Sequence, residues 1–229
     1  MARPPGRTSG PSRRLTGRLE SGRTRTQSSR AWLERQVRDP VAAEARARGF
    51  RSRSAFKLIE LDQRFDLMRP GQRIVDLGCA PGGWLQAALE HSPARLVGVD
   101  LLPVEPLAGA ILLQGDFRDP DVQQRLVAAL GAAPRLVLSD MAPNATGHRR
   151  TDQLRSIALV EAATEFAIAE LETGGTFVTK AFQGAGTEEA VKRLESAFAR
   201  VRYAKPKASR GESAEVYLIA QGLRGARAG

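Results

Sequence analysis

The feature that most constrains the fold is a regular alternation of short apolar segments with helical ones. Strand-like segments occur at residues 73–77, 95–99, 110–114, 135–139 and 176–179. Apolar residues at helical spacing lie at 84–91, 120–130, 152–171 and 187–200, and segments 201–204 and 215–220 resemble a closing pair of strands. Strands that alternate with helices are typical of a parallel sheet with helices on both faces. We therefore predict an α/β fold built on one mostly parallel sheet.

The first part of the chain has a different composition. Residues 1–26 are rich in Arg, Gly, Pro, Ser and Thr and hold few large apolar side chains. Such a segment cannot bury enough surface to offset the entropy of ordering, so we predict a disordered arm. A short helix starting near residue 28 and running to about 42, then an amphipathic helix over 52–65, begin a single domain spanning 27–221. Residues 222–229 are expected to form a frayed tail.

Positive charge is concentrated at the N-terminal end. The net charge is +10, and residues 1–53 hold 14 arginines, no lysine and four acidic residues, so the rest of the chain is neutral. A basic end on a neutral body is typical of a protein that binds a polyanion, and we favour nucleic acid. An organelle transit peptide has a similar Arg-rich and Ser-rich composition and stays open as an alternative.

Several classes of protein are excluded. No apolar run approaches the roughly 20 residues of a membrane helix, so we expect no membrane partner. An apolar core of the kind found in secretory signals is missing from the first 30 residues. The lone Cys79 cannot form an internal disulfide or a cysteine-based zinc site, and His91 and His148 are isolated, so we expect no metal. These features predict a cytoplasmic protein.

Polar residues follow the predicted strands. Asp76, Asp100, Asp116, Asp140 and Lys180 each come at or just after a strand end. One such aspartate means little, because turns favour Asp. In an open α/β sheet, however, the carboxyl ends of parallel strands meet at one edge, where ligands bind. The sequence therefore predicts that these five side chains share one site.

The turn after the first strand is rich in glycine but is not a phosphate-binding loop. Residues 76–84 read DLGCAPGGW, which lacks the GxGxxG spacing and any following GK[ST]. Asp100, 22 residues after Gly78, is placed to accept hydrogen bonds from ribose hydroxyls, and Asp116 could accept one from an adenine amino group. An acidic site suits a cationic ligand with a ribose and a base, such as S-adenosylmethionine. A related fold with another ligand stays open.

Lys180 is the candidate general base. It follows the apolar and small residues 175–179, and only five of the 35 basic residues are lysines. Burial lowers the pKa of a lysine, and an uncharged amine can accept a proton. The ordinary alternative is a surface lysine that extends its amine into water. On residue pattern alone, Lys57 and Glu215 are weaker candidates.

Six short stretches, taken together, resemble those of the FtsJ-like family of bacterial ribosomal RNA methyltransferases. They are RSRSAFKL at 51–58, VDLGCAPGGW at 75–84, QGDFRD at 114–119, SDMAPN at 139–144, KAFQG at 180–184, and Ser209-Arg210 with EVY at 215–217. The resemblance covers about residues 28–221, in the same order. It says nothing about residues 1–26.

The resemblance implies a Rossmann-like fold with a seven-stranded sheet whose last strand is antiparallel. It implies S-adenosylmethionine as cofactor and, as acceptor, the 2′-hydroxyl of one uridine in 23S rRNA of the large ribosomal subunit. The catalytic tetrad that it implies falls on Lys57, Asp140, Lys180 and Glu215. The cofactor contacts that it implies fall on Gly82, Trp84, Asp100, Asp116 and Asp140.

The RNA contacts and the exact reaction are less constrained. Arg46, Arg48, Arg51 and Arg53 lie just before Lys57 and are expected to bind phosphates. A 2′-O-methyltransferase acting on tRNA or an mRNA cap would share the tetrad, and a non-catalytic RNA-binding assembly factor could share the fold. A nicotinamide dehydrogenase is least compatible with the glycine spacing. We expect a monomer.

Overall fold

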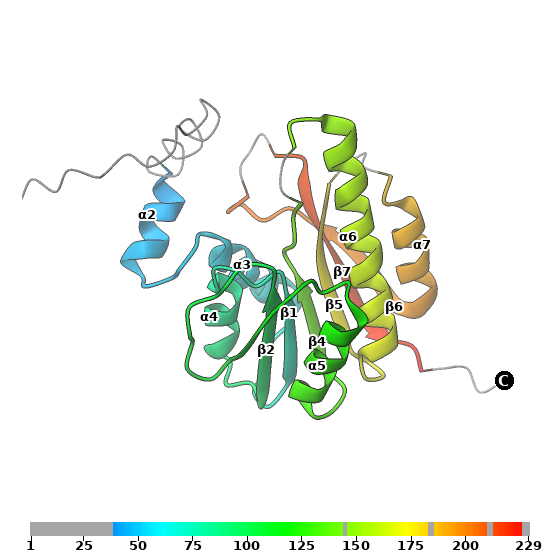
Figure 1. Ribbon diagram of the computed structural model, residues 1–229, viewed down its shortest axis with the longest axis horizontal. Helices are drawn as coiled ribbons and strands as arrows, with labels where there is room; N and C mark the ends of the chain where they lie inside the picture. The colour runs from blue at the N-terminus through cyan, green and yellow to red at the C-terminus, as the bar shows by residue number, and fades with distance from the viewer. Residues whose placement is uncertain (1–38, 144–145, 183–185, 210–212, 226–229) are drawn as a thin grey trace, which may run out of the picture. The chain divides into compact units, whose positions relative to one another are not determined.

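The computed structural model describes residues 39–143, 146–182, 186–209 and 213–225 (Figure 1). The expected arm over residues 1–26 and most of the helix expected over 28–42 lie outside these ranges. So do residues 226–229 of the expected tail. Everything below concerns the described residues.

The described residues form one seven-stranded sheet in the order β3-β2-β1-β4-β5-β7-β6. Only β7 runs antiparallel to its neighbours β5 and β6, and the other pairings are parallel. The α/β prediction and the antiparallel last strand are therefore confirmed. The strands span Arg73–Leu77 (β1), Arg95–Asp100 (β2), Ile111–Gln114 (β3), Leu136–Ser139 (β4), Thr176–Phe182 (β5), Phe198–Ala204 (β6) and Glu215–Leu223 (β7).

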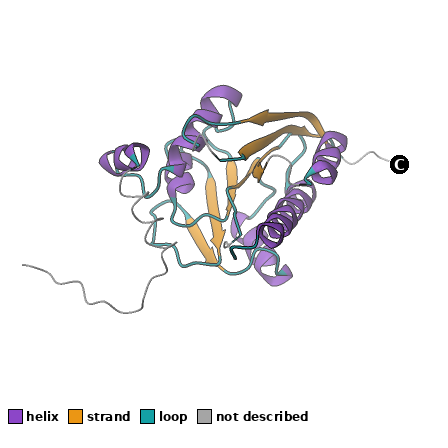
Figure 2. Ribbon diagram, turned by 90° about the horizontal axis from the view of Figure 1, so that it is seen from above, coloured by secondary structure: helices purple, strands orange, loops and turns teal. Residues whose placement is uncertain are grey.

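Helices cover both faces of this sheet (Figures 1 and 2). One face packs against α3 (Ser54–Phe65) and α4 (Gly83–Leu89), which contribute Leu58 and Leu85 to a buried cluster with Ile74 of β1. The other face packs against α5 (Pro120–Leu130), α6 (Arg149–Glu170) and α7 (Glu188–Ala197) around Val75 and Val97. β1 and β2 are buried on both faces of the sheet, which explains why their sequences consist mostly of consecutive apolar residues and do not alternate with polar ones.

Two helices begin at an Asp-Pro pair. Asp39 accepts hydrogen bonds from the backbone N–H groups of Val41 (3.0 Å) and Ala42 (3.3 Å) at the start of α2 (Pro40–Ala47). Asp119 caps α5 in the same way through Asp121. An Asp cap followed by proline satisfies an exposed N–H group and sets the first helical φ angle.

The ends of several elements differ from the sequence prediction. Helix α2 begins at Pro40, because Asp39 caps it in an extended conformation, and it runs to Ala47 rather than ending near residue 42. Helix α7 ends at Ala197 rather than near residue 200, because Phe198 is buried in the core and pairs with Leu223 as the start of β6. Strand β7 runs to Leu223, so residues 222 and 223 belong to the sheet, and the prediction of a frayed tail from residue 222 is wrong for them. Strand β5 runs to Phe182, so Lys180 lies inside the strand, opposite Tyr217 of β7.

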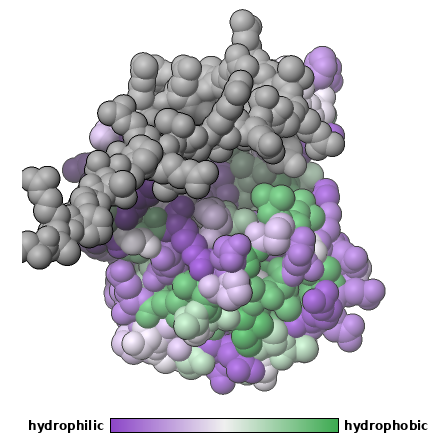
Figure 3. Space-filling model, turned by 60° about the vertical axis from the view of Figure 1, so that its left-hand side comes forward, coloured by the Kyte–Doolittle hydropathy of each residue, from purple (hydrophilic) through white to green (hydrophobic). Residues whose placement is uncertain are grey.

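Large apolar side chains on the surface are few. Among the described residues, Leu101, Leu102, Leu154 and Tyr203 are the exposed ones. On the face that Figure 3 brings forward, apolar side chains form patches between polar ones. Leu101 and Leu102 directly follow β2, at the sheet edge where the strand-end aspartates lie.

The packing of α5 on the sheet yields a stability prediction. Leu126 is fully buried, so Leu126→Ala should lower the free energy of unfolding by about 2–5 kcal/mol through lost contacts and the cavity left behind. Leu154→Ala on α6 removes an exposed side chain and should change it by less than about 0.5 kcal/mol. Urea denaturation measures both, and equal effects would contradict the described core.

Candidate active site

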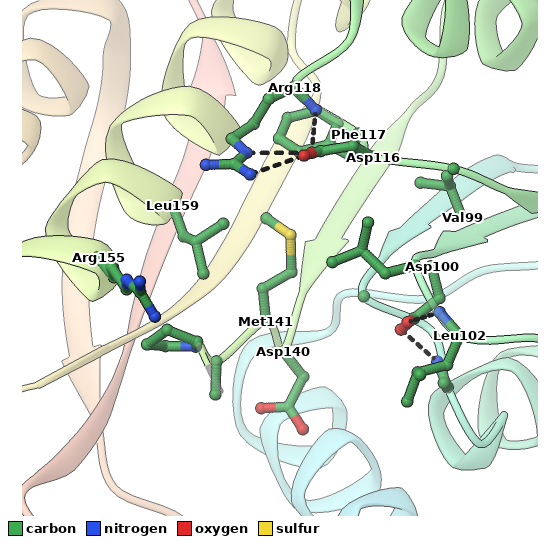
Figure 4. Close-up of a pocket in the computed structure, with 16 residues that line it drawn as sticks. Val99, Asp100, Leu102, Asp116, Phe117, Arg118, Asp140, Met141, Arg155 and Leu159 are labelled. Carbon is green, nitrogen blue, oxygen red and sulfur yellow. Dashed lines mark hydrogen bonds and ion pairs between the residues drawn. The ribbon is translucent and has the colours of Figure 1, made fainter. Parts of the chain in front are cut away.

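A cavity of about 570 Å³ lies at the carboxyl ends of β1, β2, β3 and β4. Its wall holds Gly78 and Ala80 of the glycine-rich turn and three of the predicted strand-end acids, Asp100, Asp116 and Asp140. The volume is in the usual range for a site that holds a small molecule. Figure 4 shows the three acids, which come from separate strand ends, around the same space. The structure thus brings three of the five predicted side chains to one cavity, and their contact with a ligand stays a prediction.

Asp100 joins two backbone segments at the rim of the cavity. One carboxylate oxygen accepts the N–H group of Ala80 at 2.9 Å, and the other accepts that of Leu102 at 2.9 Å (Figure 4). The carboxylate thus holds the glycine-rich turn against the loop after β2. Each carboxylate oxygen has two lone pairs, so Asp100 can still accept hydrogen bonds from a ligand.

Asp116 is paired with Arg118 in a two-point contact. Arg118 donates from Nε at 3.0 Å and from Nη2 at 2.6 Å, and both side chains line the cavity (Figure 4). These hydrogen bonds to Arg118 hold the pKa of Asp116 below its usual value. Asp116 is therefore ionised at neutral pH and keeps lone pairs for a ligand.

The turn after β1 is packed too tightly for a side chain at Gly78. This residue has φ +78°, and an added Cβ would lie 2.4 Å from Cγ of Met141, which follows Asp140. Glycine is required here both for the backbone conformation and for the close approach to the residues after β4. The close approach brings the turn and Asp140 to the same cavity.

Asp76 is the most buried acid of the group, with 1% of its surface exposed. Among the described residues, nothing donates a hydrogen bond to either of its carboxylate oxygens. Burial, with the charges of Asp140 and Asp100 nearby, raises the pKa of Asp76 well above its usual value. Within the part of the chain that the structure describes, Asp76 is thus a buried carboxyl group without a hydrogen-bond partner, close to the acids of the cavity.

The four predicted tetrad residues form two ion pairs at one end of the cavity. Lys180 Nζ donates to the backbone oxygen of Asp140 at 2.6 Å and lies 3.1 Å from its carboxylate. Lys57 Nζ lies 2.6 Å from the carboxylate of Glu215. All four side chains are at least 85% buried. Lys180 is therefore a buried, doubly held amine and not a surface lysine.

Tyr217 connects the two ion pairs. Its hydroxyl donates to Asp140 at 2.7 Å and accepts from Lys57 Nζ at 3.2 Å. Burial, together with Asp140 and Glu215, raises the pKa of Tyr217 well above its usual value, so the phenol keeps the proton that it donates. The tetrad is thus one continuous hydrogen-bonded network from Lys57 to Lys180.

Asp140 belongs to both parts of the site. Its side chain lines the cavity and also pairs with Lys180. A group bound in the cavity therefore lies next to a buried amine, with one carboxylate between the two. This arrangement suits a transfer reaction in which the amine handles a proton of the second reactant.

Comparison with known proteins agrees with this geometry. A family model described as FtsJ-like methyltransferase matches residues 50–223. A ribosomal RNA large subunit methyltransferase E of Caulobacter sp. (strain K31) is 49% identical over 98% of this chain and 100% of its own length. The chain belongs to the FtsJ-like methyltransferase family.

Two further relatives extend the likeness. The methyltransferase E of Acidiphilium cryptum (strain JF-5) is 52% identical over 95% of this chain and 96% of its own. A solved structure described as a ribosomal RNA methyltransferase from Plasmodium falciparum has a TM-score of 0.68 and 29% identity, covering 77% of this chain and all of that one. The fold described above is therefore similar to that of a solved ribosomal RNA methyltransferase.

The residues of the cavity fit the methyl donor that the family implies, which is generally S-adenosylmethionine. This donor carries a positive charge, a ribose and a base but no phosphate. The cavity offers the carboxylates of Asp100, Asp116 and Asp140, beside the unsatisfied carboxyl of Asp76. Arg118 and Arg155 also line it, and Arg118 is already paired with Asp116. A cation in this cavity would offset the acidic cluster.

Two predicted cofactor residues do not line this cavity with their side chains. Trp84 is 2% exposed; its indole N–H donates to the backbone oxygen of Ser54 at 2.8 Å, and its ring packs near Tyr217. Gly82 is the residue just before α4, has φ +109° and lies against Arg51. Both residues therefore pack on the side of the turn and of α4 that faces away from the cavity lining, and their contact with a cofactor stays a prediction.

The four arginines predicted to bind RNA divide into two pairs. Arg46 and Arg48 are exposed on and just after α2, and Arg48 also lies over the ring of Phe56. Arg51 and Arg53 are instead engaged within the protein. Arg53 pairs with Asp39 and donates to the backbone of Ala208. Arg46 and Arg48 are therefore the more exposed pair, although Arg48 also lies 4.0 Å from Glu44. Phosphate binding by all four arginines stays a prediction.

Arg51 holds the rim of the cavity in place. Its guanidinium donates to the backbone oxygens of Glu105 at 2.7 Å, Pro106 at 2.8 Å and Pro81 at 3.4 Å. It therefore ties the loop after β2 to the glycine-rich turn. The sequence gives no signal for this, because the partners are backbone atoms about 30 and 55 residues away.

Tyr217 and Ser209 are site residues that sequence reasoning missed. Ser209 donates to the Glu215 carboxylate at 2.8 Å, and Tyr217 links the ion pairs as described. A signal for Tyr217 was present, because residues two apart in a strand point to the same face, and Glu215 was already a candidate.

Among the described residues, no helix is both long enough and apolar enough to cross a bilayer. In the same ranges, no three His, Cys, Asp or Glu side chains are grouped as metal ligands would be.

The unsatisfied Asp76 carboxyl yields a pH-dependent prediction. A carboxyl with a higher pKa in the folded chain than in the unfolded one lowers the free energy of unfolding as pH rises above about 4, because the unfolded chain releases its proton first. Asp76→Asn has no proton to release. At pH 8 it should be more stable than the parent protein by about 1–2 kcal/mol, or roughly 2–8 °C in Tm.

This gain should shrink as pH falls toward 4. Thermal melts without donor at several pH values measure the difference, and Glu195→Gln, an exposed change on α7, is the control that should leave Tm nearly unchanged. A loss of stability at pH 8 in Asp76→Asn would show that the carboxylate is satisfied in the folded protein.

Proposed function

We propose that this chain transfers a methyl group from S-adenosylmethionine to the 2′-hydroxyl of a uridine in 23S rRNA of the large ribosomal subunit. The observation that carries the proposal is the double engagement of Asp140, which lines the acidic cavity and pairs with the buried Lys180. A donor pocket and a proton-accepting amine then meet at one residue.

The donor would be held by the acidic edge of the sheet. Asp100 would accept hydrogen bonds from ribose hydroxyls, and Asp116 would accept one from an amino group of the base. When bound, S-adenosylmethionine supplies an electrophilic methyl group on a positively charged sulfur. Residues of the chain would orient the acceptor hydroxyl and remove its proton.

Lys180 would act as the general base. A ribose hydroxyl is a weak nucleophile at neutral pH. Lys180 would first release its own proton to solvent, and its neutral amine would then accept the proton of the hydroxyl and become an ammonium paired with Asp140. The backbone oxygen and carboxylate of Asp140 hold that amine in position, at 2.6 and 3.1 Å. Lys57 and Glu215 would orient the ribose, and Tyr217 keeps the two pairs in a constant arrangement.

The acceptor is inferred from relatives and charge. Curated relatives about half identical to this chain are named ribosomal RNA large subunit methyltransferase E. Arg46 and Arg48 present exposed positive charge beside α3, the helix that carries Lys57. These features support an RNA acceptor and favour ribosomal RNA over tRNA or an mRNA cap. The intact tetrad argues against a non-catalytic assembly factor.

Lys180 gives the sharpest test of the mechanism. Lys180→Arg keeps the positive charge and can still donate to Asp140, but a guanidinium cannot serve as a base near neutral pH. Both Lys180→Arg and Lys180→Ala should slow methyl transfer to large ribosomal subunits by about 10²–10⁴. Donor affinity, measured by calorimetry, should change little. Transfer of a radiolabelled methyl group measures the rate, with tRNA and capped RNA as competing acceptors.

The control for these variants is Lys192→Ala, an exposed lysine on α7, which should keep the parent rate. Near-normal transfer by Lys180→Arg would contradict the general-base role. Transfer to tRNA or capped RNA in preference to large subunits would instead contradict the proposed acceptor.

Asp100 tests the donor site separately. Asp100→Asn removes the charge that would accept hydrogen bonds from ribose hydroxyls, so the Kd for S-adenosylmethionine should rise about 10–100-fold. Isothermal titration calorimetry measures this value. Asp121→Asn, an exposed change on α5, should leave it unaltered. An unchanged Kd in Asp100→Asn would place the donor elsewhere.

A further inference from the structure

A second hollow, of about 520 Å³, lies between α3 and the segment that follows β6. One wall is the outward side of α3, with Phe56, Ile59 and Arg64, and the other wall carries Lys205 and Lys207. We call this the α3 groove. None of these residues lines the donor cavity, so the groove is a separate feature of the surface.

Hydrogen bonds fix the two walls of the groove relative to each other. The backbone N–H of Lys207 donates to the carboxylate of Glu60 at 2.7 Å, and Glu60 lies 3.8 Å from Arg64 one turn later. Lys205 Nζ donates to the backbone oxygen of Ser213 at 2.8 Å. The segment after β6 is thus attached to α3 and keeps its side chains at a set position.

Each wall of the groove includes a residue that is close in sequence to a residue of the tetrad network. Phe56 precedes Lys57 in α3, and Lys207 lies two residues before Ser209, which donates to Glu215 at 2.8 Å. If the acceptor ribose of an RNA strand lies at the Lys57–Glu215 pair, the α3 groove is therefore close to the neighbouring nucleotides of that strand.

The groove combines positive charge with an apolar, partly aromatic floor. Arg64, Lys205 and Lys207 outnumber the one acid, Glu60, while Phe56 and Ile59 supply the apolar surface. The Arg48 guanidinium lies 5.0 Å from the centre of the partly exposed Phe56 ring, so a base would stack on the part of the ring that Arg48 leaves uncovered. Cations beside an aromatic ring suit single-stranded RNA, since phosphates pair with the cations and a base can stack on the ring. An acidic peptide would match the charge but would not need the aromatic ring.

We propose that the α3 groove binds a nucleotide that flanks the methylated one in the RNA strand. Its phosphate contacts Lys207, and its base lies on Phe56. This proposal rests on the proposed function for its acceptor, but RNA binding by the groove can be measured without any methyl transfer. The groove then contributes to RNA affinity and to the choice of acceptor and leaves the chemical step to the tetrad.

The test uses the full chain and two substitutions. Lys207→Ala removes one exposed cation, and Phe56→Leu keeps an apolar side chain against Phe50 but removes the stacking surface. Each should weaken binding of a labelled single-stranded oligoribonucleotide, measured by fluorescence anisotropy, with about a 10-fold loss for Phe56→Leu. Lys207→Ala should also reduce the slope of log affinity against log salt by about 0.7.

Turnover on large ribosomal subunits gives a second readout. The KM for the subunit should rise in both variants while kcat stays near the parent value. Lys192→Ala on α7, across the sheet, is the matched control for charge and should not alter RNA binding.

Each possible result has a separate meaning. Parent-like oligoribonucleotide affinity and salt slope in both groove variants would overturn the proposal. A raised KM for subunits with unchanged binding to the oligoribonucleotide would also overturn it, because the groove would then contact a ribosomal protein. If the parent protein transfers no methyl group to rRNA but the groove variants still lose RNA affinity, the proposed function fails and RNA binding by the groove stands.

Discussion

The carboxylate of Asp140 is the contact on which the whole site depends. It lies just after β4, where it lines the donor cavity, receives a hydrogen bond from Tyr217 and pairs with Lys180. A buried lysine that loses the carboxylate it pairs with is left as an uncompensated charge, which is strongly unfavourable. Asp140 therefore determines where the amine points and brings it next to the donor cavity.

The order of the strands makes this contact possible. β4 and β5 are parallel neighbours, so their carboxyl ends carry Asp140 and Lys180 to the same edge of the sheet. β7 runs antiparallel beside β5, so the start of β7 delivers Glu215 and Tyr217 to that edge as well. Lys57 arrives from α3, which packs on the face of the sheet that includes Tyr217. Four separate segments thus converge without a long loop.

Local patterns in the sequence were enough to predict the sheet and its edge, but not the contacts made over long distances. The apolar runs of β2 and β3, and the acids at or just after their ends, placed Asp100 and Asp116 at one site. The resemblance, more than the residue pattern, identified Lys57 and Glu215. Arg51 was predicted to bind phosphate, yet its guanidinium donates to three backbone oxygens. Backbone acceptors leave no trace in side-chain patterns, so only the folded chain shows that role.

The most direct test of the central claim is a map of ribose 2′-O-methylation across the ribosomal RNA of cells with and without this protein. We predict that one methylated uridine in 23S rRNA is lost without the protein and returns when the parent gene is restored. Methylation that is identical in the two strains, or a loss confined to other RNAs, would contradict the account.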